Sequence, residues 1–244
     1  MIKPGSRVEQ VTASLHSLID RHFFENGRLP SEPALADMLG ASRATVRQAL
    51  ERLARGGLII RRHGVGTFVN QRVQSIGTRL EEVWDFAEMI RTSGHEASVQ
   101  HVEMRLAPAS PKEQEKLSLQ PNSEVLSTAN VFLADGIPVI YCLDVLPASL
   151  VTQAYLDVEL QGPVYTFLEN RCGQRVDYNI TEVVPIVADA RLSKLLGCQV
   201  GDPLHYFEEI GYNADDNPIL YSEEYYRPEF FSFKVIRKMT TLKT

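Results

Sequence analysis

Residues 29–69 read LPSEPALADMLGASRATVRQALERLARGGLIIRRHGVGTFV, and this stretch decides the fold of the first part of the chain. It predicts two short amphipathic helices, the first with Ser31 as its N-cap and the second over 43–55 with Ser42 as its N-cap. A hydrophobic strand that begins at Leu58 then returns through a basic, glycine-containing turn. This order is typical of a helix-turn-helix followed by a small hairpin wing.

The second helix has the composition of a DNA-recognition helix. Its apolar residues share one face, whereas Arg43 and Arg47 lie one helical turn apart on the other side. Two short helices joined by a tight turn place the second in the major groove. There, guanidinium groups suit guanine edges or phosphate oxygens, and Thr45 can add a hydroxyl contact.

The hairpin wing supplies a second basic surface. Arg61, Arg62 and His63 could reach phosphates or an adjacent minor groove, and the glycines of the turn permit close backbone approach. The alternative interpretation is that all these charges merely solvate a surface helix. Two helices and a basic hairpin in the right order favour DNA binding over that alternative.

These residues resemble the DNA-binding domain of the GntR family of bacterial transcription regulators. The resemblance covers residues 7–70. It rests on Leu29-Pro30-Ser31-Glu32, Leu35-Ala36, Gly40 to Arg47, Ala49-Leu50, Leu53, Gly57-Leu58 and His63 to Val69. It implies DNA contacts from Ser42, Arg43, Thr45 and Arg47 on the recognition helix and from His63 and Gly64 at the wing tip. Pro33 departs from the family pattern, which often has an arginine there, so one contact is missing or differently supplied.

Charge separates this first region from the remainder of the chain. Residues 1–70 hold ten Lys and Arg against six Asp and Glu, whereas the remainder holds fifteen against twenty-five. Because affinity for phosphates is largely electrostatic, only the first region is expected to bind nucleic acid. We expect a DNA-binding domain over 1–70, a polar linker over 71–82 and a second domain over 83–244.

Composition excludes several classes of protein. The cysteines Cys142, Cys172 and Cys198 lie far apart without a Cys-x-x-Cys pair, which favours buried thiols in a reducing cytoplasm over zinc ligands or disulfides. No apolar stretch approaches the ~20 residues of a membrane span, and the N-terminus lacks a signal core. We therefore expect a cytoplasmic protein without membrane association, metal site or cofactor.

The remainder of the chain predicts an α+β domain with a mostly antiparallel sheet and flanking helices. Two hairpins are indicated, one around the turn Asp135-Gly136 and one around Asp215-Asp216-Asn217. The predicted strands cover 98–106, 125–133, 138–146, 177–187, 203–213, 219–226 and 231–236. The predicted helices cover 84–92, 110–117, 149–154, 164–170 and 188–196. An apolar helical stripe at 8–19 is expected to pack onto the helix-turn-helix.

This second region, about 80–240, resembles the UTRA effector-binding domain of HutC-type GntR regulators, which has a chorismate-lyase-like fold. The resemblance rests on Phe86 to Met89, Gly94-His95-Glu96, Leu133 to Pro138, Leu146-Pro147, Leu195-Leu196-Gly197, Gly201 to Leu204, Asn217-Pro218, Tyr221-Ser222 and Tyr225-Tyr226-Arg227. It implies a pocket for a small metabolite, commonly an anion such as a sugar phosphate.

The sequence departs from the sugar-phosphate readers of that family in the pocket. The resemblance aligns their paired arginines with Asn130 and Phe132, a glutamate with Cys142, a serine with Pro163 and a late glutamate with Leu220. A phosphate dianion needs charge-assisted donors, and the arginine pair is absent. We therefore expect a ligand that is not phosphorylated and is less acidic, either neutral or more apolar.

Nine residues are candidates for the effector pocket, and two of them, Tyr165 and Tyr226, keep the family's aromatic character. The candidates are Ala87, Asn130, Phe132, Cys142, Asp144, Tyr165, Glu182, Leu220 and Tyr226. Asp144 and Glu182 could accept hydrogen bonds from hydroxyl or amine groups. The alternative interpretation is that the apolar candidates are ordinary core and that the two acids are solvated.

Rival functions are an enzyme fused to a DNA-binding module and an all-helical, metal-binding effector domain. The second region is short for an aminotransferase-like domain, and it lacks a glycine-rich phosphate loop, a nucleophile elbow and a two-histidine metal spacing. Its strand-rich pattern also disfavours the all-helical class. The resemblance implies a homodimeric repressor that reads an inverted repeat in double-stranded operator DNA. Activation in place of repression, and the sign of the effector's action, stay open.

Overall fold

The helices of the N-terminal region begin where the sequence places their caps. The computed structural model describes residues 6–21, 23–74, 79–80, 85–151 and 163–237. The elements are α1 (Arg7–Asp20), η1 (Glu25–Gly27), α2 (Glu32–Leu39), α3 (Arg43–Arg55), β1 (Ile59–Arg62), β2 (Gly66–Val69) and α4 (Gln71–Gln74). Ser6 forms a capping box with Glu9, and Gly40 ends α2 in the left-handed conformation.

One hydrophobic core holds the N-terminal elements together. It contains Val11, Leu15 and Ile19 of α1, so the apolar stripe predicted over 8–19 packs as expected. The other buried members are Phe24, Leu29, Leu35, Ala36, Val46, Ala49, Leu50, Leu53, Leu58, Ile59 and Val73. The core therefore fixes α3 against α1 and α2 and leaves the opposite face of α3 to solvent.

Two segments beyond the wing also join the N-terminal unit. The described residues fall into two compact units, one made of residues up to 80 together with 233–237, and the other made of 85–232. Val73, within the stretch expected to be a linker, is buried in the N-terminal core. Arg79 pairs with Lys234 in a parallel bridge, and Ile236 packs on the same core. Residues 233–237 thus belong to the same unit as the winged helix.

The second unit is built on a six-stranded sheet in which every pair is antiparallel, ordered β3-β4-β5-β8-β7-β6. Its strands are β3 (Ala97–Pro108), β4 (Glu124–Ala134), β5 (Ile137–Pro147), β6 (Tyr178–Val187), β7 (Pro203–Tyr212) and β8 (Pro218–Tyr226). The predicted α+β class with a mostly antiparallel sheet is confirmed. The Asp135-Gly136 turn joins β4 and β5, with positive φ at both residues as this turn type requires.

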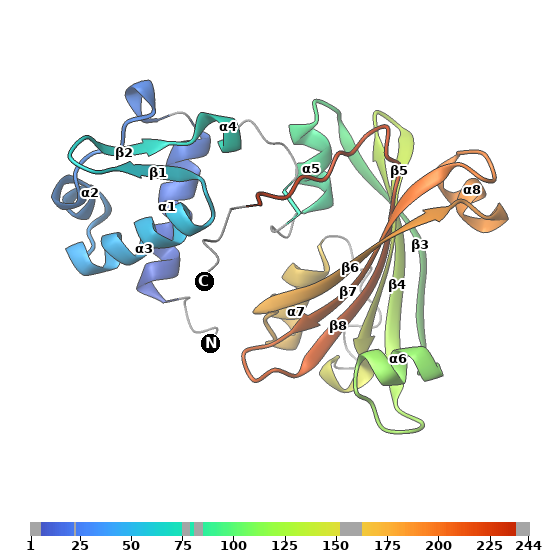
Figure 1. Cartoon of the computed structure of the whole chain (residues 1–244). Helices are drawn as coiled ribbons and strands as arrows, with labels where there is room; N and C mark the ends of the chain where they lie inside the picture. The colour runs from blue at the N-terminus through green and yellow to red at the C-terminus, as the bar shows by residue number, and fades with distance from the viewer. Residues whose placement is uncertain (1–5, 22, 75–78, 81–84, 152–162, 238–244) are drawn as a thin grey trace, which may run out of the picture. The chain divides into compact units, whose positions relative to one another are not determined.

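Helices cover both faces of this sheet (Figure 1). They are α5 (Phe86–Thr92), α6 (Pro111–Lys116), η2 (Ala148–Leu150), α7 (Val164–Cys172) and α8 (Ala190–Leu196). Leu192 and Leu196 of α8 pack on Tyr141, whereas Leu168 of α7 packs on Leu146 and Leu220. Because neighbouring strand residues alternate between faces, α7 and α8 lie on opposite sides. The aromatic contacts of α5 place it on the same side as α7.

Two predicted elements differ from the structure. Residues 231–236 form no regular strand, because only Lys234 makes a bridge and the chain turns at Pro228, which has no N–H group to donate. The helix predicted over 149–154 is a short 3-10 turn at 148–150, and the part of it beyond 151 lies outside the described residues.

Candidate nucleic-acid interface and effector site

The recognition helix α3 is fixed at its N-terminus by its own side chains. Ser42 accepts a hydrogen bond from the backbone N–H of Thr45 at 3.1 Å, and the two hydroxyl groups lie 2.8 Å apart. This N-cap satisfies a backbone donor that would otherwise be unpaired. The two hydroxyl-bearing residues implied as DNA contacts therefore also define where the helix starts.

The exposed side of α3 carries the predicted arginines. Val46 and Leu50 are buried, whereas Arg43 and Arg47 are exposed at the edge of this buried face. Their positions one turn apart make both available to a groove of DNA. Both side chains are exposed, as the sequence pattern predicts.

Glu32 links the recognition helix to the wing. Arg47 Nε donates to Glu32 Oε2 at 3.1 Å, and Arg61 Nη2 lies 3.6 Å from Glu32 Oε1. The Arg47 side chain is 62% exposed and the Arg61 side chain 38% exposed, so both keep access to solvent. One carboxylate at the start of α2 thus holds two candidate DNA-contacting arginines from separate elements.

A phenylalanine and a second arginine support the wing. Arg62 lies over the ring of Phe68 at 5.1 Å, and Arg28 lies over the same ring at 5.9 Å. Arg28 Nη2 also donates to the carbonyl of Val65 in the turn at 3.0 Å. Cations on an aromatic face, together with this hydrogen bond, hold the hairpin in place. The wing is therefore a braced surface with basic groups along it.

The exposed tip of the wing contains His63 and Gly64. Gly64 has φ +72°, a conformation that favours glycine, and no atom lies within 4 Å of the position that a Cβ would take. Backbone at this tip is open to a macromolecular surface. The structure brings Arg61, Arg62, His63 and Gly64 together on one hairpin, as predicted.

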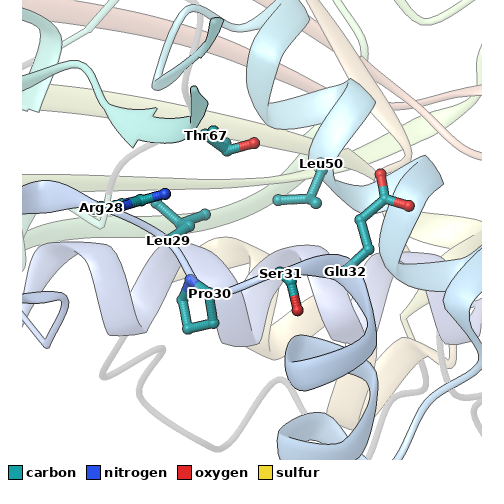
Figure 2. Close-up of a pocket in the computed structure, with 8 residues that line it drawn as sticks. Arg28, Leu29, Pro30, Ser31, Glu32, Leu50 and Thr67 are labelled. Carbon is teal, nitrogen blue, oxygen red and sulfur yellow. The ribbon is translucent and has the colours of Figure 1, made fainter. Parts of the chain in front are cut away.

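A hollow separates the start of α2 from the wing and α3. It is lined by Arg28, Leu29, Pro30, Ser31, Glu32, Leu50, Gly66 and Thr67. Figure 2 shows that the Ser31 hydroxyl and the Glu32 carboxylate point in opposite directions. Ser31 caps α2 by accepting from Ala34, which leaves Glu32 to reach the arginines. The sequence analysis assigned no role to Glu32, which lies within the segment it quoted, or to Arg28, which directly precedes that segment.

In the second unit, strand register gathers most of the effector candidates on one face of the sheet. Asn130 of β4 lies opposite Cys142 of β5, and Asp144 lies two residues further along β5 on the same face. Leu220 and Tyr226 of β8 share this face, because Tyr226 lies opposite Ile140. The α7 helix contributes Tyr165, which contacts the neighbouring strand β7.

Asp144 is the centre of a buried hydrogen-bond group on this face. Its Oδ1 accepts from the Ser222 hydroxyl at 2.6 Å and from the Cys142 thiol at 3.4 Å. Burial raises the pKa of Asp144 to about 6, although both hydrogen bonds act to lower it. Burial also raises the pKa of the Cys142 thiol, which therefore stays protonated.

Two further buried carboxylates face the same cluster. The Tyr226 hydroxyl donates to Glu224, and the hydroxyls of Tyr165 and Thr181 donate to Glu209. Burial, followed by the nearby charge of Glu209, raises the pKa of Glu224 well above its usual range. These acids did not appear among the sequence candidates. Glu224 could have been found, because period-two alternation puts it on the face of Tyr226.

Aromatic rings form an apolar wall beside the acids. The Phe86 ring of α5 lies 4.8 Å from that of Phe132 and 6.1 Å from that of Tyr226, both in edge-to-face geometry. Ala87 is half-buried next to Phe86 on α5. Asn130 is buried, and His101 Nδ1 lies 3.0 Å from its Oδ1.

Two candidates lie apart from this group. Glu182 of β6 is exposed and lies opposite Glu208, on the other face of the sheet from Thr181 and Asp144. Leu220 shares the face of Asp144, but it is fully buried in a hydrophobic cluster with Leu168. The structure does not bring Glu182 to the acids that it gathers around Asp144.

The other face of the sheet holds a contrasting polar group. Lys112 Nζ lies 2.8 Å from Glu208 and 2.7 Å from Glu223, and Lys116 also pairs with Glu208. Burial acts to raise the pKa of Glu208, but hydrogen bonds from the two lysines lower it to about 2. On this face, each partly buried carboxylate has a cationic partner.

Comparison with family models gives one match in each of the two parts of the chain. Residues 7–69 match the model described as bacterial regulatory proteins, gntR family, and residues 92–232 match the UTRA domain. A histidine utilization repressor of Pseudomonas aeruginosa is 32% identical over 179 residues, covering 72% of this chain and 69% of that protein. A probable fructoselysine utilization operon transcriptional repressor of Escherichia coli K12 is 26% identical and covers 86% of both chains.

Solved structures share the fold over nearly the whole chain. The possible transcriptional regulator YydK of Bacillus subtilis has a TM-score of 0.73 at 18% identity, covering 95% of this chain and 99% of that one. PhnF of Mycobacterium smegmatis has a TM-score of 0.61 at 23% identity, covering 94% and 100%. In the described part of this chain, no helix is long and apolar enough to span a membrane.

Proposed function

Because the chain belongs to the gntR family of bacterial regulatory proteins and carries a UTRA domain, we propose that it is a repressor whose operator affinity is set by a small metabolite. The observation that carries this proposal is the exposed arginine face of α3 next to a braced basic wing. Relatives named as repressors of histidine and fructoselysine utilization support the direction of control.

On operator DNA, α3 lies in the major groove. Arg43 and Arg47 contact base edges or phosphates, with Ser42 and Thr45 at the N-terminal end of the helix. Arg61, Arg62, His63 and Gly64 of the wing contact the adjacent backbone or minor groove. A homodimer places two such units on the half-sites of an inverted repeat in double-stranded DNA, within the cytoplasm where that DNA lies.

The second domain, which the structure describes as a unit over 85–232, binds the effector on the sheet face that holds Asp144 and Tyr226. Binding of the effector changes operator affinity through the linker expected over 71–82. The size of this change is limited by the difference between the effector's affinities for the DNA-competent and DNA-incompetent states. The role is binding and not catalysis. In support, the family models that match the chain are those of bacterial regulatory proteins and of the UTRA domain.

Selection of duplexes from a random-sequence library with the full chain tests this function directly. We expect enrichment of an inverted repeat, and anisotropy titrations should show that Arg43→Ala and Arg47→Ala each weaken binding roughly tenfold to a hundredfold. Arg52→Ala is the matched control, since Arg52 lies at the other end of α3 and faces Glu9 at 3.8 Å. Failure to enrich any duplex would refute the proposal, and equal losses in all three variants would refute the assigned contacts.

A further inference from the structure

Three carboxylates are buried side by side on adjacent strands of the effector domain. Asp144 of β5 is 6% exposed, Glu224 of β8 is 7% exposed and Glu209 of β7 is 8% exposed. Asp144 lies opposite Ser222, and Ser222 lies opposite Glu209 on its other side. Directly opposed residues have Cβ atoms about 5 Å apart, so these acids share one small region of the sheet face.

Only neutral groups donate to these three acids. Among the described residues, no lysine or arginine contacts any of them. Their donors are Ser222, Cys142, Tyr226, Tyr165 and Thr181. Buried charges are normally paired with an opposite charge, because desolvation of an unpaired ion is expensive. Burial, together with the nearby charge of Glu209, raises the pKa values of Asp144 and Glu224.

On the opposite face of the same sheet, acids with a structural role are paired with cations. There, Lys112 and Lys116 from α6 pair with Glu208 and Glu223. A chain that neutralises carboxylates on one face and leaves three without a cation on the other has a reason other than stability for the second arrangement.

Next to this cluster, the side-chain oxygen of Asn179 is a buried acceptor that lacks a hydrogen-bond donor in the part of the chain that the structure describes. Asn179 Nδ2 donates to the Tyr165 hydroxyl at 3.1 Å, and that hydroxyl donates to Glu209 at 2.8 Å. The Asn179 Oδ1 atom is buried and has no hydrogen-bond partner among the described residues. A buried acceptor without a donor costs free energy, so a hydrogen-bond donor supplied by a ligand would be favourable at this position.

We infer that the effector carries a cationic nitrogen, as a primary ammonium or guanidinium group, which these carboxylates bind beside the aromatic wall formed by Phe86, Phe132 and Tyr226. The inference rests on the proposed function, since it names the ligand class of the same domain. Both groups present several N–H donors to acceptor oxygens, and aromatic faces attract cations. An organic cation fits better than a metal ion, because no described group of His, Cys, Asp and Glu is arranged as a metal site.

A series of small ligands that differ in charge tests this inference on the full chain. Thermal shift and calorimetry at pH 8 would compare pentylamine and agmatine with the neutral 1-pentanol and the anionic pentanoate. We expect saturable stabilisation by the two cations alone. Asp144→Asn and Glu224→Gln should each weaken binding of the cations roughly tenfold to a hundredfold. Glu182→Gln, an acid on the opposite face, should leave it unchanged.

The opposite results overturn the inference. Stabilisation by pentanol or pentanoate equal to that by the amines would show that charge is not recognised. Unchanged cation binding in both acid variants, or no stabilisation by either cation at millimolar concentration, would do the same. Circular dichroism confirms that each variant is folded. Operator binding by the same preparations distinguishes failure of this inference from failure of the proposed function. If a sugar phosphate releases the chain from the operator, the proposed function stands and the inference of a cationic effector fails.

Discussion

Arg47 of the recognition helix and Glu32 at the start of α2 form an ion pair through two guanidinium nitrogens, each 3.1 Å from Glu32 Oε2. The same carboxylate lies 3.6 Å from Arg61 of the wing. In the absence of DNA, a single acid therefore restrains two arginines that would otherwise attract any phosphate. We interpret Glu32 as a residue that limits binding to DNA lacking the operator sequence.

Glu32→Gln should raise the affinity for non-operator duplex and lower the ratio of operator to non-operator binding. Two arginines lose their carboxylate and gain attraction for phosphates. Stability should change by less than about 1 kcal/mol, because the pair is exposed. Anisotropy titrations against both duplexes over a series of salt concentrations measure the effect. Glu51→Gln on α3 provides the control for loss of one negative charge. An unchanged specificity ratio would contradict this role.

Ser42 has two roles that substitutions can separate. Ser42→Ala removes the N-cap of α3 and should lower the free energy of unfolding by about 1 kcal/mol. Ser42→Asp keeps a capping oxygen, so stability should be retained, but the added negative charge should repel DNA phosphates and weaken operator binding. Thermal unfolding and anisotropy on the same samples give both quantities. If Ser42→Asp binds operator as well as the unchanged protein does, Ser42 does not face DNA.

Asp144→Asn should alter the pH dependence of stability. The carboxyl pKa is about 6 in the folded protein, against 3.8 in the unfolded chain. The folded state thus holds a proton that the unfolded state has released, and the free energy of unfolding falls as pH rises between about 4 and 6, by about 3 kcal/mol. The free energy of unfolding of Asp144→Asn lacks this decrease. Its melting temperature relative to the unchanged protein should therefore increase over that interval and stay level above it.

Thermal melts at steps of pH check this expectation. Cys142, Glu209, Glu224 and Tyr226 face the same cluster, and the charge of Asp144 contributes to the raised pKa values of Cys142 and Glu224, so the difference reports Asp144 together with its effect on these neighbours. Glu182→Gln, which changes an exposed acid, should follow the profile of the unchanged protein. Parallel profiles for Asp144→Asn and the unchanged protein would show that this carboxyl is not buried in solution.

Gly211→Ala should disturb the contact between β6 and β7. A Cβ at this position would lie 2.8 Å from Asn179 Oδ1 and 3.2 Å from Leu220 Cβ, both too close. Overpacking of this kind costs about 1 to 3 kcal/mol. Gly56→Ala, where the nearest atom is at 3.6 Å, is the matched control. Denaturant unfolding of both variants makes the comparison, and equal stability would mean that Asn179 moves aside freely.

Features that depend on neighbouring residues in the sequence were predictable. Ser31 and Ser42 cap helices through N–H groups three residues away, and Asp135-Gly136 closes a hairpin by its own backbone conformation. The placement of Arg43 and Arg47 followed from helical periodicity alone. These elements needed no information from distant parts of the chain.

Pairings between distant elements were not predictable in the same way. The partner of Glu32 on the wing is 29 positions away, and nothing local indicates it. Glu182 and Thr181 are neighbours on the edge strand β6, so their side chains lie on opposite faces of the sheet. Neither residue of this strand is fully buried, and the sequence therefore did not decide which of the two lies on the face of Asp144. Glu209 and Glu224 are buried only because β7 and β8 lie in the middle of the sheet.

The bridge between Arg79 and Lys234 has a consequence for how such proteins can be recombined. Leu80 donates to the carbonyl of Lys234 at 2.8 Å, and Ile236 contributes to the core around α1 and α3. The DNA-binding module is therefore encoded by two separated stretches of the gene. A chimera that exchanges only the first eighty or so codons between relatives would join one protein's winged helix to another protein's tail, and a functional exchange must carry both ends.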